Sequence, residues 1–196
     1  MAKASQVSKD LKIVILLGSP RKKGNSAALA ERVAAGAAAA GATVETVFLH
    51  GMKIMPCTAC EACHQPQGEG CIIEDDMRGL YPKLKEADAI VWTSPIYWFT
   101  LSAQLKLALD RCYALLGPEG HAFKGKRMAL AFSYGGDDPF DSGCINAIRT
   151  FQDAFSFIGA EILGMVYGSA AGAGDIRSNT KVMAEAMELG RKLAAG

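Results

Sequence analysis

Four cysteines follow one another closely in the sequence, at a spacing that suits a metal centre. Cys57, Cys60 and Cys63 are separated by two residues each, and Cys71 follows after seven more. Three thiols at this spacing can wrap one [4Fe–4S] cube. The segment 64–70 contains a proline and two glycines, which can turn the chain so that the fourth thiol returns to the others. The sequence therefore predicts these four cysteines as candidate ligands of an iron–sulfur cluster.

Other interpretations of the four thiols stay open. A zinc site normally shows a second close pair of ligands, although His64 could join three cysteines around a zinc ion. The thiols could also remain reduced in a loop, or Cys57 and Cys60 could form a redox pair. The spacing by itself leaves the cluster, zinc and free thiols as alternatives.

The segment 18–26, Gly-Ser-Pro-Arg-Lys-Lys-Gly-Asn-Ser, joins an apolar run to a helical pattern and is rich in anion-binding groups. Backbone N–H groups at a helix start attract an anion, and hydroxyl, amide and guanidinium groups donate to phosphate oxygens. The segment lacks the G-x-G-x-x-G pattern of dinucleotide loops and the Gly-Lys-Ser/Thr of nucleoside-triphosphate loops. It therefore predicts a monophosphate site, with an ordinary capped turn as the alternative. The candidate residues are Ser19, Arg21, Gly24, Asn25 and Ser26.

Aromatic residues gather where a later apolar run ends, in the segment 94–99, Ser-Pro-Ile-Tyr-Trp-Phe. A flat heteroaromatic ring can lie against such side chains while backbone N–H groups reach its polar edge. Alternatively, the aromatic rings pack on the following helix or on another subunit. Paired glycines after a further apolar run would let the backbone approach a ligand closely. The candidate ring-binding residues are Pro95, Ile96, Tyr97, Trp98, Ser133, Gly135 and Gly136.

Apolar runs alternate with helical patterns along the chain, and this order predicts how the two candidate sites are positioned. The predicted strands are residues 12–17, 43–48, 89–93, 127–133 and 162–167, and the predicted helices are residues 26–40, 76–87, 102–116, 144–157 and 179–193. Continuous apolar strands joined by crossover helices form parallel sheets that are covered on both faces. Five such strands match the doubly wound, flavodoxin-like α/β order 2-1-3-4-5, whose loops meet at the carboxyl edge of the sheet. We also expect Asn25 or Ser26 to cap the first helix, and Asp75–Asp76 to cap the second.

Length and composition restrict the class of protein. A chain of 196 residues with 50% apolar residues fits one domain over residues 1–196, with polar residues 1–10 as a flexible N-terminus. A formal net charge of +1 gives no broad basic field for a nucleic acid or an anionic membrane. No apolar run reaches the roughly 18 residues that span a bilayer. We therefore expect a soluble, cytoplasmic protein without nucleic-acid or membrane partners.

Taken together, the motifs resemble those of the NADPH-dependent FMN reductase family, and especially its iron–sulfur flavoprotein branch. The similarity covers Gly-Ser-Pro-Arg at 18–21 and Gly-Asn-Ser at 24–26. It also covers Ser-Pro-Ile-Tyr-Trp at 94–98, Ser-Ala-Gln-Leu-Lys at 102–106 and Asp-Arg at 110–111. The resemblance implies that residues 95–98 border the flavin ring and that the glycine pair at 135–136 completes the site. The residues that it implies for the FMN phosphate are Ser19, Arg21, Asn25 and Ser26.

The resemblance also implies an oxidoreductase in which NADPH or NADH reduces FMN, and the flavin passes electrons to a small-molecule acceptor. Because the flavin carries the difficult chemistry, no catalytic side chain is expected. The alternative is an iron–sulfur flavoprotein electron carrier with a ferredoxin-like partner, although the near-neutral charge of the chain favours the enzyme. A homodimer or homotetramer is implied, in which the segment after Pro95 joins neighbouring subunits.

Overall fold

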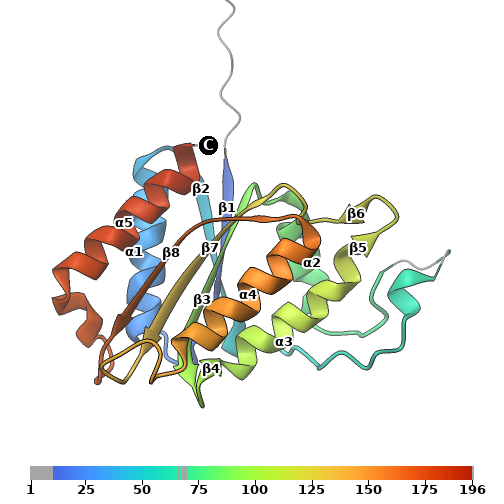
Figure 1. Cartoon of the computed structure of the whole chain (residues 1–196). Helices are drawn as coiled ribbons and strands as arrows, with labels where there is room; N and C mark the ends of the chain where they lie inside the picture. Colours follow the sequence, from blue (N-terminus) through green and yellow to red (C-terminus); the bar gives the residue numbers. More distant parts are fainter. Residues whose placement is uncertain (1–10, 66, 68–69, 196) are drawn as a thin grey trace, which may run out of the picture.

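The computed structural model describes residues 11–65, 67 and 70–195 (Figure 1). The N-terminus expected to be flexible, residues 1–10, lies outside the described residues. So do the proline and one of the two glycines that were expected to turn the segment 64–70. No helix in the described part of the chain is long and apolar enough to cross a membrane.

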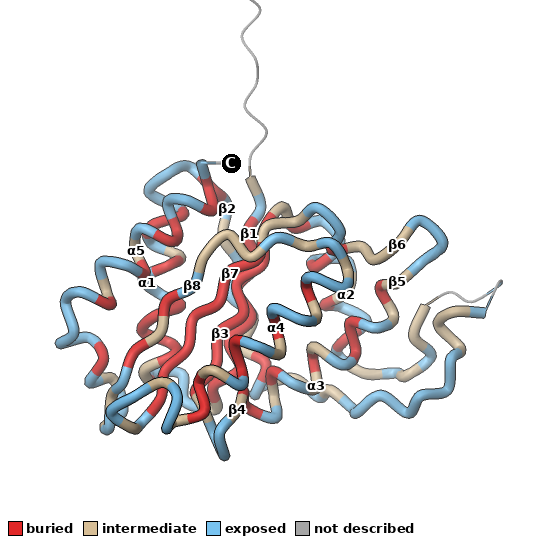
Figure 2. Tube along the Cα trace, viewed as in Figure 1, coloured by how far each residue is buried: buried red, intermediate tan, exposed pale blue. Residues whose placement is uncertain are grey.

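Five parallel strands form the centre of the molecule in the order β2-β1-β3-β7-β8, which confirms the predicted topology. These strands are β1 (Lys12–Leu17), β2 (Thr43–Phe48), β3 (Ala89–Tyr97), β7 (Arg127–Tyr134) and β8 (Glu161–Ser169). The three central strands are buried almost throughout, because helices cover both faces of the sheet (Figure 2). Short pairs complete the described strands: β4 (Thr100–Leu101) returns antiparallel to β3, and β5 (Leu116–Gly117) pairs with β6 (Gly120–His121).

Two helices cover one face of the sheet and three cover the other (Figure 1). The first group is α1 (Asn25–Ala39) and α5 (Thr180–Ala195), and the second is α2 (Met77–Glu86), α3 (Ala103–Arg111) and α4 (Cys144–Ile158). Alternation along β3 divides the core, since Ala89 and Val91 face the first group while Ile90 and Trp92 face the second. The sheet therefore fixes the positions of the loops at its carboxyl edge through two separate apolar layers.

Helices α1 and α5 pack with their backbones almost in contact. A Cβ atom added to Gly190 would lie 2.0 Å from the carbonyl oxygen of Val33, and one added to Gly36 would lie 1.9 Å from that of Met187. Neither position can hold a larger residue at this helix spacing, because any side chain would push the helices apart.

Several predicted boundaries differ from the structure. The strand predicted to end at residue 93 continues to Tyr97, because Ser94 and Pro95 keep pairing with β7. The helix predicted over 102–116 ends at Arg111 and continues as a 3₁₀-helix (Cys112–Leu115). Neither Asn25 nor Ser26 caps α1, whose N-cap is Gly24 without a side-chain bond. At α2 the N-cap is Asp76, whose side chain makes no capping bond, whereas the preceding Asp75 accepts a hydrogen bond from the Met77 N–H.

Candidate cofactor site and cysteine loop

A cleft at the carboxyl edge of the sheet brings together the loops after β1, β3 and β7, as predicted, whereas no described residue of the loop after β2, expected at the same edge, lines it. It is also walled by residues after β8, which were not predicted. The residues that line it are Ser19, Arg21, Gly24, Asn25, Ser26, Pro95, Ile96, Tyr97, Ser133, Tyr134, Gly135, Ala170 and Ala171. Trp98 and Gly136 line an adjoining cleft of about 700 Å³, which shares four residues with the first and also contains Phe99, Asp141 and Ser142. The predicted phosphate-binding and ring-binding residues therefore lie in two connected parts of one site.

The N-terminus of α1 forms the end of the cleft that suits a phosphate. The Oγ of Ser19, which is 3% exposed, accepts a hydrogen bond from the Arg21 N–H at 3.1 Å and shapes the turn before the helix. Ser26 and Ser133 are buried, and their hydroxyl oxygens are 2.8 Å apart. The first N–H groups of a helix have no intrahelical acceptor and carry partial positive charge. With the exposed Arg21 at the rim, this end of the cleft can bind an anion of small size.

The amide of Asn25, predicted to bind the phosphate, forms hydrogen bonds with backbone groups of the loop after β8. Its Nδ2 donates to the carbonyl oxygens of Ala170, at 3.4 Å, and Gly172, at 2.9 Å. Its Oδ1 accepts from the N–H groups of Gly174, at 2.8 Å, and Ile176, at 3.2 Å. The side chain thus fastens the loop after β8 to the first turn of α1. Sequence reasoning missed this loop because its glycines and alanines carry no anion-binding side chain.

Replacing Asn25 tests this assignment. We expect Asn25→Ala to weaken FMN binding by about 1–3 kcal/mol, because the loss of these hydrogen bonds loosens the loop that walls the cleft. Hydrogen exchange should become faster in residues 170–176, whereas Asn179→Ala, which removes the hydrogen bond that the Val182 N–H donates to the Asn179 Oδ1, should leave that loop protected. Weaker FMN binding with unchanged exchange would instead show that the Asn25 amide contacts the phosphate directly.

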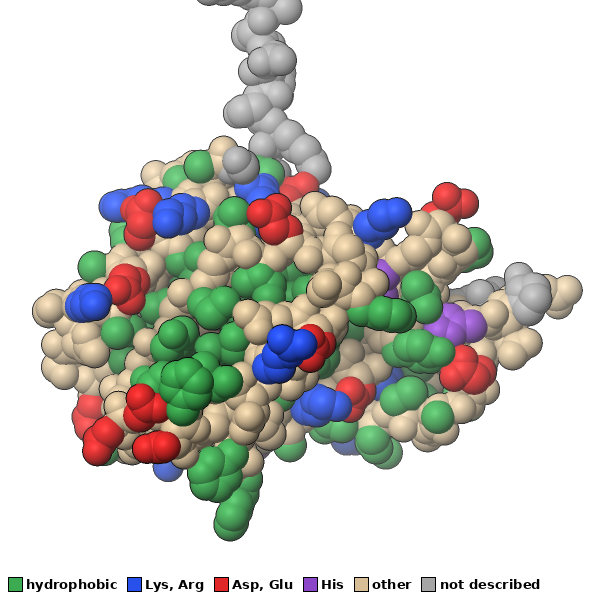
Figure 3. Space-filling model, viewed as in Figure 1, with side chains coloured by type: hydrophobic (Ala, Val, Ile, Leu, Met, Phe, Trp, Pro, Cys, Tyr) green, Lys and Arg blue, Asp and Glu red, His purple; other side chains and the backbone are tan. Residues whose placement is uncertain are grey.

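The other end of the cleft is an aromatic hairpin tip between β3 and β4. Trp98 is 91% exposed and Phe99 is 55% exposed, and both have positive φ, at 45° and 62°. Figure 3 shows hydrophobic side chains projecting from this end of the molecule. Asn146 Nδ2 donates to the Phe99 carbonyl oxygen at 3.0 Å, and a Cβ on Gly143 would lie 2.4 Å from the Phe99 Cα. The tip is therefore held in a strained conformation by α4 while its rings stay open to a ligand or another subunit.

Two buried serines join the loops of the cleft. Ser102 Oγ donates to the Gly18 carbonyl oxygen at 2.7 Å, and the Ser102 N–H donates to Ser94 Oγ at 2.9 Å. These bonds connect the loop after β1 to the end of β3. The sequence placed Ser102 in a family motif, but its role depends on contacts with residues distant in the chain.

The four predicted cysteines line one small pocket on a loop that leaves the carboxyl end of β2. None of them is in a disulfide; Cys57 and Cys60 are exposed, while Cys63 and Cys71 are half-buried. A hydrogen bond from the Ala62 N–H, followed by one from Thr58, lowers the pKa of Cys60, whereas burial raises that of Cys63. Over residues 11–65, 67 and 70–195, no three cysteine, histidine or acidic side chains are grouped so that they could hold a metal ion. The four thiols are the donors that an iron–sulfur cluster or a zinc ion takes, but the loop as described does not gather them around a metal ion.

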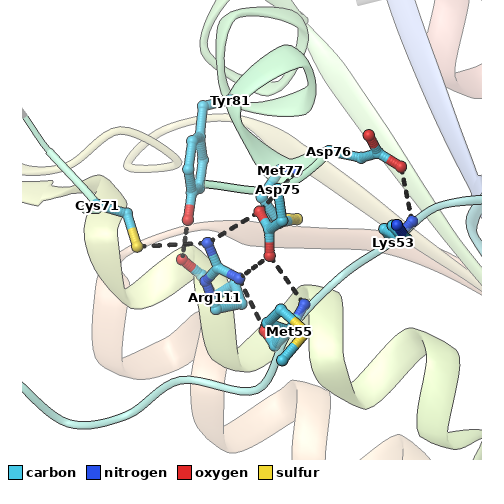
Figure 4. Close-up of polar contacts among 8 residues, drawn as sticks. All are labelled: Lys53, Met55, Cys71, Asp75, Asp76, Met77, Tyr81 and Arg111. Carbon is cyan, nitrogen blue, oxygen red and sulfur yellow. Dashed lines mark hydrogen bonds and ion pairs between the residues drawn. The ribbon is translucent and has the colours of Figure 1, made fainter. Parts of the chain in front are cut away.

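The loop is fastened to the body of the protein by a buried ion pair that the sequence did not single out (Figure 4). The side chains of Arg111 and Asp75 are 1% and 2% exposed, and the guanidinium donates to both carboxylate oxygens. Burial opposes the ionisation of Asp75, but the hydrogen bond from Arg111 and those from two backbone N–H groups outweigh it and lower its pKa. Tyr81 donates to the Arg111 carbonyl oxygen at 3.1 Å. Its own pKa is raised, mainly by burial.

The middle of the loop is held by a second, more exposed set of contacts. His64 Nε2 lies 3.1 Å from the Tyr113 carbonyl oxygen, and its Nδ1 lies 3.2 Å from a carboxylate oxygen of Glu61. The hydroxyl of Tyr113 donates to Glu61 at 3.1 Å. His64 therefore uses both ring nitrogens on neighbouring oxygens, an arrangement that does not present it as a zinc ligand.

The other two cysteines lie in the core. Burial raises the pKa of Cys112 and of Cys144 to about 12. Both thiols therefore pack as apolar side chains, unlike the four thiols of the loop, which are exposed or half-buried.

A doubly wound sheet with a helix start suited to an anion and an aromatic hairpin at its carboxyl edge is typical of flavodoxin-like flavin-binding proteins. Comparison with known sequences narrows this class: residues 11–175 match the model of the NADPH-dependent FMN reductase family. The chain belongs to that family and is an FMN-dependent oxidoreductase.

Individual relatives agree with this assignment. The chain is 33% identical to an iron–sulfur flavoprotein of Methanosarcina thermophila over 79% of this chain and 78% of that protein. It is 30% identical to a Bacillus subtilis (strain 168) protein provisionally named an NAD(P)H-dependent FMN-containing oxidoreductase, over 91% of this chain and 96% of that protein.

Solved structures share the fold. The structure of the Trp repressor binding protein from Bacillus subtilis is 27% identical with a TM-score of 0.67, covering 91% of this chain and 98% of that one. An NAD(P)H:quinone oxidoreductase from Methanothermobacter marburgensis, at 19% identity and a TM-score of 0.71, covers 94% and 97% and shows the common fold.

Proposed function

We propose that this protein transfers electrons from NADPH or NADH through FMN to a planar organic acceptor. The observation that carries the proposal is the two-part cleft, in which an anion-binding end and an aromatic end are built from adjoining loops. FMN, when bound, supplies the two-electron chemistry by accepting a hydride from the nicotinamide and returning two electrons to the acceptor. The protein's own residues bind, orient and expose the reacting ring.

Each end of the cleft has a distinct part in this proposal. The start of α1, with Arg21 and Ser26, binds the phosphate and so fixes the position of the ring. The aromatic side chains at 97–99 offer flat, exposed surface on which a nicotinamide or an acceptor can stack beside the flavin. No side chain needs to act as an acid or nucleophile in this scheme.

Anaerobic stopped-flow measurement of flavin reduction tests the proposed function. We expect NADPH or NADH to bleach the flavin absorbance of the FMN-loaded protein, with reoxidation when a quinone or another planar acceptor is added. Bleaching by a reduced ferredoxin, with no reaction with either nicotinamide, would contradict this proposal and favour an electron carrier with a ferredoxin-like protein partner.

For the cysteine loop we propose one [4Fe–4S] cluster per chain on Cys57, Cys60, Cys63 and Cys71. The support is that all four line one pocket as free thiols and that a relative with 33% identity is named an iron–sulfur flavoprotein. Anaerobic reconstitution should give about four iron and four sulfide per chain, and Cys71→Ala should abolish both while FMN stays bound. Zinc in place of iron, or loss of FMN together with the cluster, would contradict the proposal.

We further propose that the aromatic hairpin tip packs against a second copy of this chain, in a homodimer or homotetramer. The support is the exposure of Trp98 and Phe99, together with Phe140, which is 71% exposed. Light scattering should give the mass of a dimer or tetramer, and Trp98→Lys should shift it toward the monomer. A monomeric parent protein would contradict this arrangement.

A further inference from the structure

One buried ion pair joins the two ends of the cysteine loop. Nη1 of Arg111 donates to the carbonyl oxygen of Met55 at 2.7 Å, two residues before the first cysteine of the loop. Nη2 donates to the sulfur of Cys71, the last cysteine, at 3.3 Å. Asp75 completes the arrangement by accepting from the Met55 N–H at 2.8 Å (Figure 4). The chain therefore leaves and re-enters the body of the protein at one guanidinium group.

Two packed helices hold the Arg111–Asp75 pair, whereas part of the cysteine loop that it contacts is exposed. Arg111 is the last residue of α3, and Asp75 binds the first turn of α2 through the Met77 N–H at 3.0 Å. Both helices belong to the apolar layer on one face of the sheet. The four cysteines line a pocket next to Arg111, and two of them, Cys57 and Cys60, are exposed. The ion pair thus fixes one thiol while leaving the others free to adjust.

Stability alone is a poor explanation for burying these charges. Replacing a buried ion pair by apolar residues of similar volume is often neutral or stabilising, whereas removing one partner is strongly destabilising. In addition, Nε of Arg111 has no hydrogen-bond partner among the described residues. What the pair provides, and an apolar pair could not, is directed hydrogen bonding to Met55 and Cys71.

We propose that Arg111, oriented by Asp75, is a positioning residue for the cysteine loop: it closes the neck of the loop and presents Cys71 to the other three thiols. This inference rests on the proposed cluster site. It also places an N–H donor on a ligand sulfur, and hydrogen bonds to ligand sulfurs are among the features that set the potential of an iron–sulfur cluster. Because such a bond favours the more negative, reduced form, Arg111 should raise the reduction potential.

The experiment compares the full-length, FMN-loaded protein with four variants. Arg111→Met removes the directed bonds, and Arg111→Lys keeps the charge but not the planar fork. Arg111→Met with Asp75→Leu removes both charges, so that folding does not depend on an unpaired carboxylate. Arg149→Met is the matched control, because Arg149 forms an exposed ion pair with Asp153 on α4.

Iron, sulfide and FMN are measured after anaerobic reconstitution, and the cluster potential is measured by redox titration. We expect Arg111→Met and the double variant to hold FMN normally but to assemble about tenfold less cluster, as for other residues that orient metal ligands. Arg111→Lys should restore part of the cluster at a lower potential, and Arg149→Met should match the parent. Parent-level cluster with an unchanged potential in the double variant would overturn the proposal.

A second readout does not depend on the cluster. In the metal-free protein, a glutamyl endopeptidase should cleave after Glu61 faster in the double variant than in the parent or Arg149→Met, because the neck of the loop is open. Equal cleavage rates in all three would overturn the positioning role. A parent protein that takes up no iron but shows the expected difference in cleavage would contradict the cluster and leave the role of Arg111 in holding the loop supported.

Discussion

Arg21→Glu is expected to weaken FMN binding by about 3 kcal/mol, or about 100-fold, while the protein stays folded. Arg21 lies at the rim of the cleft with its side chain exposed, so its replacement disturbs no packing. In the proposed site, the substitution would remove a charge-assisted hydrogen bond to the phosphate and put a like charge beside it. Titration of the FMN-free protein, followed by flavin fluorescence, measures the change. The loss should shrink as salt is added, because exposed charges are screened.

Lys23→Glu provides the matched control for Arg21. It makes the same change of charge two residues away, on an exposed side chain that is not among those lining the cleft. We expect this variant to bind FMN within a few-fold of the parent. Equal losses in the two variants would mean that the net charge of the loop, and not the position of Arg21, governs affinity.

Gly190→Ala is expected to lower the free energy of unfolding by about 3 kcal/mol, in spite of the higher helix propensity of alanine. The added Cβ would lie 2.0 Å from the Val33 carbonyl oxygen and 2.7 Å from the Ala37 nitrogen, so two helix backbones must move apart. For a chain of this length the melting temperature should fall by roughly 6–12 °C. Thermal unfolding of the FMN-free protein, followed by circular dichroism, avoids the contribution of bound cofactor.

Gly79→Ala is the control for this prediction. Gly79 lies in α2, is exposed, and has no atom within 4 Å of the position of an added Cβ. Alanine there should raise the free energy of unfolding by about 0.5–1 kcal/mol. A similar gain from Gly190→Ala would show that α1 and α5 are not in close contact in solution.

The fold could be predicted from the sequence because its signal is local and repeated. Each central strand is an apolar run that is buried on both faces, and the glycine- and proline-containing turns beside the strands mark their ends. The predicted ends of helices and strands differ from the structure where tertiary contacts determine them. Pairing with β7 and then with β4 extends β3 to Tyr97, and α3 gives way at Arg111 to a 3₁₀-helix over Cys112–Leu115.

The candidate cleft was likewise predictable as a set of loops, because the topology places the carboxyl ends of parallel strands together. The roles of individual side chains within the cleft could not be predicted in the same way. Asn25 has the composition of a phosphate ligand, yet its amide is engaged by four backbone groups of a loop that starts 145 residues later in the chain. No local pattern reports such a distant partner.

The sequence by itself determined the parallel sheet, the loop rich in groups that can bind an anion, the aromatic segment and the grouping of four cysteines, because each depends on residue type and short spacing. The tertiary structure alone decided that Arg111 and Asp75 form a buried pair at the neck of the cysteine loop. In the sequence analysis Arg111 entered only as part of the Asp-Arg motif at 110–111, and charged side chains are seldom fully buried. Its burial is compensated because the fold brings a carboxylate and a carbonyl oxygen from separate segments to the same guanidinium, and sequence spacing does not report this juxtaposition.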